Sequence, residues 1–155
     1  PNPVLFIENK RLYAAKGDVP EPPQPVEIGK ARLVRPGSDL TLVTYGATVG
    51  MAEKAALTQA QQGIEIEIID LRSLQPWDEQ TVLESLSRTH RLLILHEATE
   101  AFGVGAEIAA RMADIGFDEL DAPIIRLGAP FVPIPYSVAL EADFGPTEQQ
   151  LDDAR

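Results

Sequence analysis

The chain has 155 residues, no cysteine, and 24 acidic against 13 basic side chains, which gives a formal net charge of −11. Without cysteine, disulfides, thiolate metal sites and a cysteine nucleophile are excluded, and we expect a reducing cytoplasm. The acidic balance disfavours nucleic acid as a partner, and no apolar run approaches the ~18 residues of a membrane span. The length fits one domain, and the acidity suits either a basic protein partner or solubility alone.

The beginning of the chain predicts a segment that is separate from the main domain. Residues 3–10 (PVLFIENK) predict a short buried strand. The residues after them are rich in proline and charge, and proline lacks an amide donor and fixes φ. We therefore expect residues 14–27 to form an extended linker, and the first strand to belong to a preceding domain. Because the chain opens on Pro1 instead of Met, we expect a fragment or a processed product.

Residues 28–63 predict two strands and a helix. Polar and apolar residues alternate over 29–35, as in a half-buried strand, and residues 40–46 predict a second strand after the turn PGSD. We expect these two strands to pair as a hairpin. Thr48 is expected to cap the following helix and Gly63 to end it.

The rest of the sequence alternates strands and helices. Strands are predicted at 64–70, 91–98 and 122–128, and helices at 79–87, capped by Asp78, and at 103–115. A proline-rich tail ends in the polar sequence TEQQLDDAR. This order predicts an α/β fold with three layers, α/β/α, and a mostly parallel sheet. The one antiparallel strand is expected to be the strand before PGSD.

Two acid–base side chains stand at the carboxyl end of the predicted central strand, where open α/β sheets bind ligands. They are His96 and Glu97, and both can move protons. One hypothesis is a ligand or active site formed by His96, Glu97 and Tyr45. Consecutive strand residues point to opposite faces, however. In the alternative, one of the pair caps the next turn, the other forms a hydrogen bond at an interface, and Tyr45 packs in the core or an interface.

The glycines after this strand do not match a phosphate-binding loop. Gly103 and Gly105 give G-x-G, but Ile108 stands where a dinucleotide fingerprint has its third glycine. Glu107 would repel a phosphate in the first turn of the predicted helix, although it favours the helix dipole. We therefore expect the small residues to let two backbones approach closely.

The remaining polar residues do not suggest a self-contained active site. Asp70 and Arg72 are expected to form a structural ion pair, with each other or across an interface. The two histidines, His90 and His96, lack metal-ligand spacing, and there is no G-x-S-x-G. We therefore expect no catalytic, cofactor-binding or metal-binding residue in this chain.

The order of motifs resembles one family over nearly the whole chain. The motifs are LFIENKRLY, IGKARLVRPGSDLTLVTYGATV, IEIIDLRSLQPWDEQTVLESLSRTHRLLILHEA, AFGVGAEIAARM and LDAPIIRLGAPFVPIPYSVALE, of which LVTYGA and DLRSLQPWD are quite specific. They resemble the C-terminal domain of the β subunit of thiamine-diphosphate-dependent 2-oxo-acid dehydrogenases, which include the pyruvate, branched-chain and acetoin enzymes. The broader transketolase-type C-terminal domain shares the fold with less similar sequence.

The resemblance implies a transketolase C-terminal fold over residues 28–155, with a five-stranded mixed sheet containing one antiparallel strand. Residues 1–13 would be the last strand of a pyrimidine-binding domain, followed by the linker at 14–27. The family oxidatively decarboxylates a 2-oxo acid on thiamine diphosphate with Mg and passes the acyl group to a lipoyl group. Because that cofactor lies between two other domains, we expect this domain to bind none and to be inactive alone.

The resemblance also implies a role in assembly and docking. The expected partners are a second β subunit in a homodimer, the α subunit or diphosphate-binding domain, and the basic peripheral subunit-binding domain of the lipoyl acyltransferase, which suits a charge of −11. The candidate interface residues are Tyr45, His96, Glu97, Phe102, Gly103, Gly105, Glu107 and Ile108. A bulky residue in place of Gly105 is expected to weaken self-association.

Two departures from the family pattern bear on docking. Phe131 stands where the family often has an acidic residue, and the chain stops at TEQQLDDAR where the family usually has an amphipathic helix. Two alternatives remain open. The chain could be the C-terminal domain of another thiamine enzyme, of the transketolase or deoxyxylulose phosphate synthase type, or it could hold its own ligand at His96, Glu97 and Tyr45.

Overall fold

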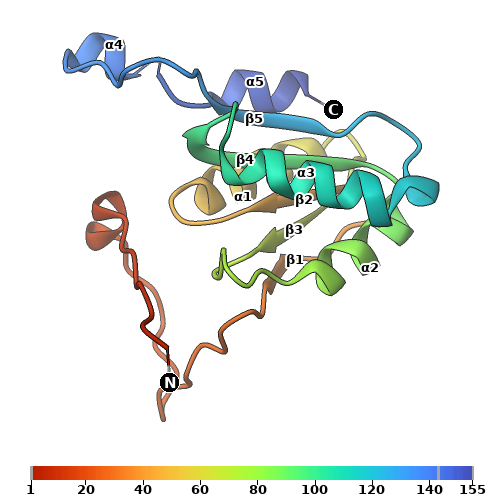
Figure 1. Ribbon diagram of the computed structural model, residues 1–155, viewed down its shortest axis with the longest axis horizontal. Coiled ribbons are helices and arrows are strands. Elements are labelled where there is room, and N and C mark those ends of the chain that lie inside the picture. The colour runs from red at the N-terminus through yellow and green to blue at the C-terminus, as the bar shows by residue number, and fades with distance from the viewer. Residues whose placement is uncertain (1, 143, 155) are drawn as a thin grey trace.

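The computed structural model describes residues 2–142 and 144–154 and places a five-stranded sheet between two layers of helices (Figure 1). The strands are β1 (Arg32–Arg35), β2 (Leu40–Thr44), β3 (Ile66–Asp70), β4 (Leu92–Thr99) and β5 (Ile125–Ala129). The helices are α1 (Thr48–Ala60), α2 (Glu79–Thr89), α3 (Val104–Ile115), α4 (Val138–Ala142) and α5 (Glu148–Asp153), with short 3-10 helices η1 (Lys10–Ala14) and η2 (Phe117–Glu119). The predicted three-layer α/β/α architecture is confirmed.

The strands lie in the order β1-β3-β2-β4-β5, and β1 is the one antiparallel strand among the described residues, as predicted. The predicted hairpin is wrong, because β1 pairs with β3 and not with β2. Strand β2 lies at the centre of the sheet and is parallel to a neighbour on each side, with Thr41 opposite both Glu67 and Leu92. Both of its edges are therefore occupied, and the free edge of β3 receives β1.

Alternate residues of the central strands build two hydrophobic cores, one on each face of the sheet. On one face, Leu42 and Leu95 pack with α1 and with Leu151 of α5. On the other face, Val43 and Ile94 pack with α2 and α3. Because both faces are covered, the central strands are nearly continuous runs of apolar residues, as is usual for parallel strands.

The starts of the helices agree only in part with the predicted caps. The Asp78 carboxylate accepts a hydrogen bond from the amide of Thr81 at 3.3 Å, so the cap of α2 is confirmed. Thr48 does not cap α1, because the N-cap is Ala47 and Thr48 is the first helical residue. Its hydroxyl instead donates to the Tyr45 carbonyl at 2.8 Å. The chain turns at Gly46, with φ 66°, so the helix begins one residue earlier than expected.

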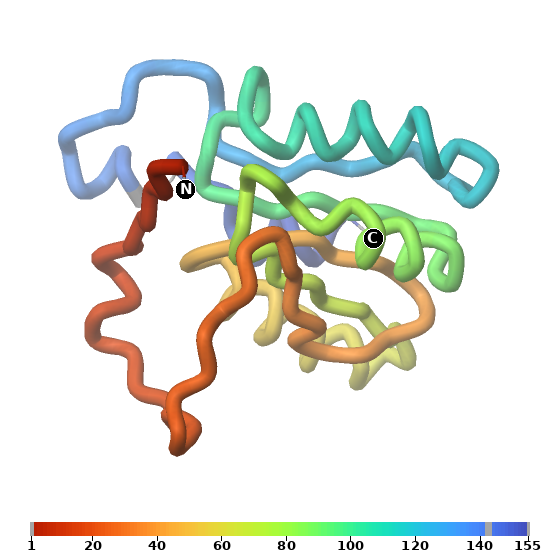
Figure 2. Tube along the Cα trace, turned by 60° about the horizontal axis from the view of Figure 1, so that its bottom comes forward, coloured from red at the N-terminus to blue at the C-terminus, as the bar shows by residue number. Residues whose placement is uncertain are grey.

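The first residues form an extended arm instead of the predicted buried strand. Leu5 is 92% exposed, and the described residues before η1 contain no strand. The proline-rich stretch that follows, residues 15–27, has neither helix nor strand, and its role as a linker stays a prediction. In Figure 2 the arm returns toward the segment that carries α4, and Arg11 lies 3.8 Å from Glu141. Whether this arm belongs to the sheet of a preceding domain stays a prediction.

The end of the chain forms a short helix, where the sequence suggested only a polar tail. Thr147 and Gln150 form a capping box at the start of α5. Leu151 is buried against α1, and Gln59 of α1 donates a hydrogen bond to Asp152. Leu151, together with the partly buried Ala154 and the hydrogen bond from Gln59, places this helix against α1.

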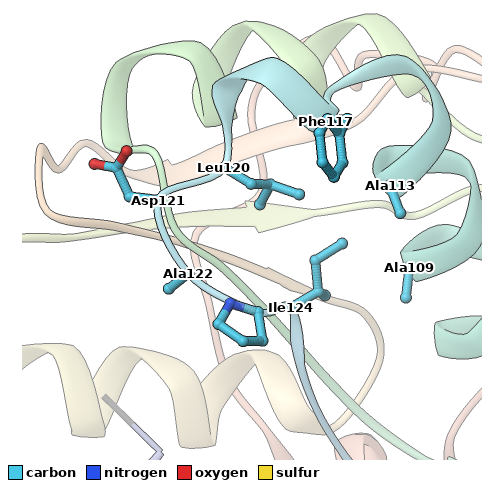
Figure 3. Close-up of a pocket in the computed structure, with 8 residues that line it drawn as sticks. Ala109, Ala113, Phe117, Leu120, Asp121, Ala122 and Ile124 are labelled. Carbon is cyan, nitrogen blue, oxygen red and sulfur yellow. The ribbon is translucent and has the colours of Figure 1, made fainter.

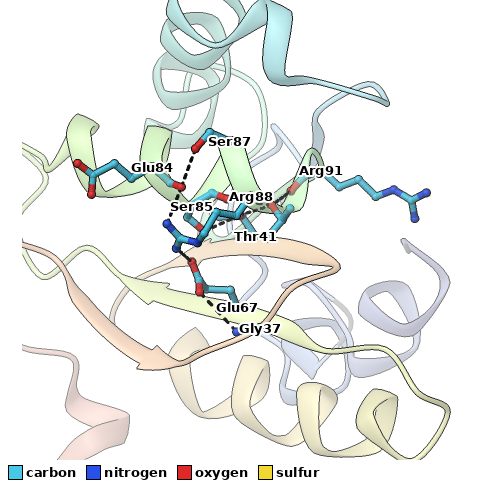
Figure 4. A network of polar contacts seen from close by, with 9 residues as sticks. Gly37, Thr41, Glu67, Glu84, Ser85, Ser87, Arg88 and Arg91 are labelled. Carbon is cyan, nitrogen blue, oxygen red and sulfur yellow. Dashed lines mark hydrogen bonds and ion pairs between the residues drawn. The ribbon is translucent and has the colours of Figure 1, made fainter.

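A buried polar network fastens α2 to the amino-terminal end of the sheet (Figure 4). The Thr41 hydroxyl lies 2.6 Å from the hydroxyls of both Ser85 and Thr89, and all three side chains are buried. Beside them, Arg88 donates to the buried Glu67 carboxylate at 2.5 Å. Buried polar groups stabilise a fold only when they are paired, so these contacts fix the position of α2 on β2 and β3.

Replacing Thr41 with Val should lower the free energy of unfolding by about 1–3 kcal/mol, because it leaves the buried Ser85 hydroxyl without its short hydrogen bond. Urea unfolding followed by circular dichroism measures the change. The matched control is Ser87→Ala on the same helix, where the hydroxyl is exposed and the expected change is within about 0.5 kcal/mol. Equal effects of the two substitutions would contradict this role of the network.

Candidate functional site

Parallel strands bring three candidate residues to one edge of the sheet, where β2 and β4 end. The rings of Tyr45 and His96 stack with centroids 6.1 Å apart and planes at 24°. His96 is completely buried on the face covered by α2 and α3. Glu97, the next residue, is directed to the other side and accepts hydrogen bonds from Asn9 and Arg11 of the arm, at 2.5 and 3.3 Å. The structure therefore stacks Tyr45 on His96, whereas the Glu97 carboxylate bonds to the arm.

Both ring nitrogens of His96 are engaged inside the chain. Its Nε2 accepts a hydrogen bond from the backbone amide of Gly105 at 3.1 Å, and its Nδ1 lies 3.0 Å from the Ala98 carbonyl. An acceptor at Nε2 and a carbonyl beside Nδ1 require a neutral ring that carries its proton on Nδ1. His96 thereby caps the start of α3, which the N-cap residue Gly103 leaves without a side-chain hydrogen bond.

Glycines from two elements enclose the His96 ring. A Cβ atom on Gly105 would lie 2.2 Å from Nε2, and a Cβ atom on Gly128 of β5 would lie 2.9 Å from Cε1. A Cβ atom on Gly103 would lie 2.0 Å from the Thr99 carbonyl oxygen. The G-x-G pattern is therefore a close approach of backbone to an imidazole within one chain, and a bulky residue at 105 would displace that ring. Such a substitution cannot report on self-association.

The electrostatic surroundings favour the uncharged form of both rings. Burial lowers the pKa of His96 below its ordinary value, and the nearby Arg126 lowers it further, against opposing contributions from the Ala98 carbonyl and Glu100. Burial, and then the charge of Glu97, raise the pKa of Tyr45. At neutral pH the imidazole and the phenol are thus uncharged, and the lone pair of Nε2 already accepts a hydrogen bond. This arrangement favours a structural pair over a catalytic one.

The eight candidate interface residues divide into buried and accessible positions. His96, Gly105 and Ile108 are buried inside the chain, and Tyr45 and Gly103 are half-buried. Glu97, Phe102 and Glu107 are exposed. Only the accessible residues can meet a partner directly, while the buried ones position the turn between β4 and α3.

Phe102 is the most distinctive residue of that turn. It is 89% exposed and has φ 59°, a left-handed conformation that is costly for a bulky residue. Its ring contacts Phe131 in the loop after β5, with centroids 5.4 Å apart and planes tilted by 55°. Phe131 is therefore half of an exposed aromatic pair.

The loop after β5 carries an apolar surface that sequence reasoning missed. Its exposed apolar side chains are Phe131, Val132, Ile134, Tyr136, Val138 and Leu140. The signal was present in the sequence, since apolar residues alternate with prolines in PFVPIPY. The prolines of this segment disfavour a helix or a central strand, so the sequence predicts only a tail here. Exposed apolar side chains of this kind are typical of interaction sites.

A separate apolar groove lies at the far end of α3 (Figure 3). Its volume is about 550 Å³. Its main lining residues are Ala109 and Ala113 of α3, Phe117 and Leu120 around η2, and Asp121 and Ile124 before β5. Phe117 is 72% exposed although its ring is apolar. Acidic side chains of Asp114, Glu119 and Asp121 are close to the groove in sequence and accessible to solvent.

The remaining charged candidates form structural contacts. Asp70 forms its ion pair with Arg32 of β1 at 3.4 Å, while the positive charge of Arg72 is near enough to favour the ionised Asp70 carboxylate. An ion pair across an interface stays a prediction. Arg72 also contributes its backbone amide, 3.3 Å from the Asp70 carboxylate, because its left-handed φ of 54° turns the chain there. Among residues 2–142 and 144–154, no three His, Asp or Glu side chains gather as metal ligands would. None of the helices in that range is both long and apolar enough to cross a membrane.

Comparison with known proteins gives one consistent family. The family model described as "Transketolase, C-terminal domain" matches residues 29–151. A solved split gene transketolase, an inactive β4 tetramer, has a TM-score of 0.74 at 25% identity, over 89% of this chain and 44% of that one. The fold and the family model therefore agree.

Curated relatives are β subunits. The chain is 44% identical to acetoin:2,6-dichlorophenolindophenol oxidoreductase subunit beta of Bacillus subtilis, over 97% of this chain and 44% of the relative. It is also 44% identical to pyruvate dehydrogenase E1 component subunit beta of Rhizobium meliloti, over 99% and 34%. Identity to mitochondrial 2-oxoisovalerate dehydrogenase subunit beta 2 of Arabidopsis thaliana is 43%, over 99% and 43%. The chain thus spans less than half the length of these relatives. It belongs to the transketolase C-terminal domain family, in the form carried by β subunits of 2-oxo-acid dehydrogenases.

Proposed function

We propose that this domain assembles and docks the decarboxylating component of a 2-oxo-acid dehydrogenase complex, and that it is inactive alone. The observation that carries the proposal is the separation of functions within the domain. Both ring nitrogens of His96 at the carboxyl edge are engaged in internal contacts, while large apolar residues are exposed on two surfaces. The parent reaction would be thiamine-diphosphate-dependent decarboxylation with acyl transfer to a lipoyl group, carried out by other domains. A cytoplasmic location stays a prediction.

The start of α3 does not fit the diphosphate group of thiamine diphosphate. A diphosphate would need free amides at a helix start, but the Gly105 amide donates to His96 and the Ala106 amide donates to the Gly103 carbonyl. Glu107 adds a negative charge in the same turn. These contacts support a role for α3 in packing and not in phosphate binding.

We place the docking of the acyltransferase's peripheral subunit-binding domain at the groove beside η2. The groove offers an apolar floor from Ala109, Ala113 and Leu120, which a helix of the partner can fill. Asp121 at its edge, with Asp114 nearby, offers negative charge to a basic partner. An apolar floor with an acidic rim fits a small basic domain better than it fits a neutral or acidic one.

Replacing Asp121 with Lys should raise the Kd for a purified peripheral subunit-binding domain by about tenfold, because it reverses one rim charge. Isothermal titration calorimetry measures the change, which should shrink as salt increases. The matched control is Glu53→Lys on α1, an exposed site that changes the net charge equally. If the control weakens binding as much as Asp121→Lys does, net charge and not this groove attracts the partner.

We place subunit contact, including self-association, at the aromatic pair and the apolar loop after β5. Phe102 and Phe131 are close together, exposed and apolar, as the central residues of an interface are. The arm also exposes apolar residues, and Arg11 and Asn9 hold it near this edge through Glu97. An interface here would cover Phe102 without using the buried glycines.

Replacing Phe102 with Asn should weaken self-association by about tenfold in Kd, because it removes an exposed aromatic anchor. Asn tolerates the left-handed conformation at this position, so the fold should persist. Sedimentation equilibrium measures the association. The matched control is Leu57→Gln on α1, where an exposed apolar side chain lies on another helix. An unchanged dimer in the Phe102 variant would place the contact elsewhere.

The competing hypothesis, a ligand site at His96, Glu97 and Tyr45, makes an opposite prediction. With thiamine diphosphate and Mg ions, or with 2-oxo acids, we expect no change in the melting temperature of this chain. A bound ligand at 100 times its Kd would add about 2.7 kcal/mol to the free energy of unfolding. A dose-dependent rise that Tyr45→Phe abolishes would establish the ligand site and overturn the assembly proposal.

A further inference from the structure

We propose that His96 is a proton-sensitive latch: its neutral ring holds the turn before α3 against β4 and β5, and protonation of the ring releases that turn together with Phe102. The imidazole is buried and is enclosed by backbone from α3 and β5. These contacts lie within this chain and require neither docking nor self-association.

The neutral ring joins three parts of the chain. Nδ1 lies 3.0 Å from the Ala98 carbonyl, which fixes the end of β4, and Nε2 accepts from the Gly105 amide, which fixes the start of α3. Cε1 lies against Gly128 of β5, where a Cβ atom would be only 2.9 Å away. The turn that carries Phe102 lies between the first two of these contacts, so its conformation depends on the ring.

A second proton would disrupt this arrangement directly. Protonated histidine carries N–H groups at both ring positions, so the new N–H at Nε2 would face the N–H of Gly105. Two donors cannot form a hydrogen bond, and the positive charge would stand at the positive end of the α3 dipole. The glycine enclosure leaves no room for the ring to rotate away within the packed fold. The turn must therefore move.

The charged groups around the ring do not compensate for this cost. From β5, Arg126 opposes a positive charge on His96, although it is itself held by the Glu100 carbonyl at 2.7 Å. Glu100 favours the charged ring only weakly, and Tyr45 is uncharged beside it. Glu97 is directed away toward the arm, and Glu107 in the first turn of α3 is exposed. Burial is the largest influence, and it lowers the pKa of His96.

The direction of the pH effect follows from this lowered pKa. At pH values above the ordinary histidine pKa of 6.5, His96 is neutral in both the folded and the unfolded chain. Its contribution to the free energy of unfolding then does not change with pH. Below that value the unfolded chain takes up a proton that the folded chain does not. The folding equilibrium constant should therefore fall by up to about tenfold for each pH unit until the folded ring is also protonated.

The test compares urea unfolding of the full 155-residue chain from about pH 8 to about pH 5.5, the range in which histidine titrates. His96→Gln removes the titrating ring, and its amide oxygen can still accept from Gly105. The matched control is His90→Asn, because His90 is the other histidine in the chain, and Asn tolerates its left-handed φ of 57°. Wild type and His90→Asn should share the extra loss of stability below pH 6.5, and His96→Gln should lack it.

Nuclear magnetic resonance of the wild type supplies a measurement that does not depend on any variant folding. At neutral pH the ring nitrogens of His96 should show the proton on Nδ1, and on acidification the Gly105 amide and Phe102 ring signals should shift together with the ring. A proton on Nε2 at neutral pH would overturn the latch. The latch would also be overturned if the Gly105 amide signal stayed unchanged while His96 titrated. An equal loss of stability at acidic pH in His96→Gln and in the wild type would overturn it too.

Discussion

One hydrogen bond, from the Gly105 amide to Nε2 of His96, organises the carboxyl edge of this domain. It requires a neutral imidazole, a glycine at 105, and an end of β4 that lies beside the start of α3. Because the ring lies against Gly128 as well, the same side chain sets the distance between β4, β5 and α3. Tyr45 then stacks on that ring, and Phe102 is held in a left-handed turn beside it. The exposed aromatic pair thus rests on a buried polar contact.

The groove beside η2 and the loop after β5 have different chemistry. The groove beside η2 has small apolar residues and a nearby carboxylate, Asp121, whereas the loop after β5 presents large aromatic and aliphatic side chains separated by prolines. They lie at opposite ends of α3, one near its start and one near its end. One helix can therefore serve two contacts at once, and its buried side, with Ile108 and Met112, keeps both in fixed relation to the sheet.

Much of the architecture was predictable because it depends on local pattern. The alternation of polar and apolar residues, with glycines at the ends of segments, predicted the strands. The cap at Asp78 was predictable because aspartate is a common N-cap residue. The pairing of β1 with β3 was not predictable, since it depends on which sheet edge remains free after β2 takes its central place. For the site, opposite orientation of His96 and Glu97 followed from strand geometry. The enclosure of His96 by Gly105 and Gly128 could be found only from the three-dimensional structure, because β5 begins about 30 residues after His96.

The reversed direction of β1 has a consequence for how the domain is attached. Arg32, its first residue, stands opposite Asp70, the last residue of β3, so the chain enters the sheet at the edge where the parallel strands end. A parallel β1 would have moved that entry by about 13 Å, the length of four residues, to the opposite edge. The arm can therefore reach Glu97 without crossing the sheet. A single antiparallel strand thus brings the arm to the end of the sheet at which Glu97 lies, and the arm contacts the main domain there.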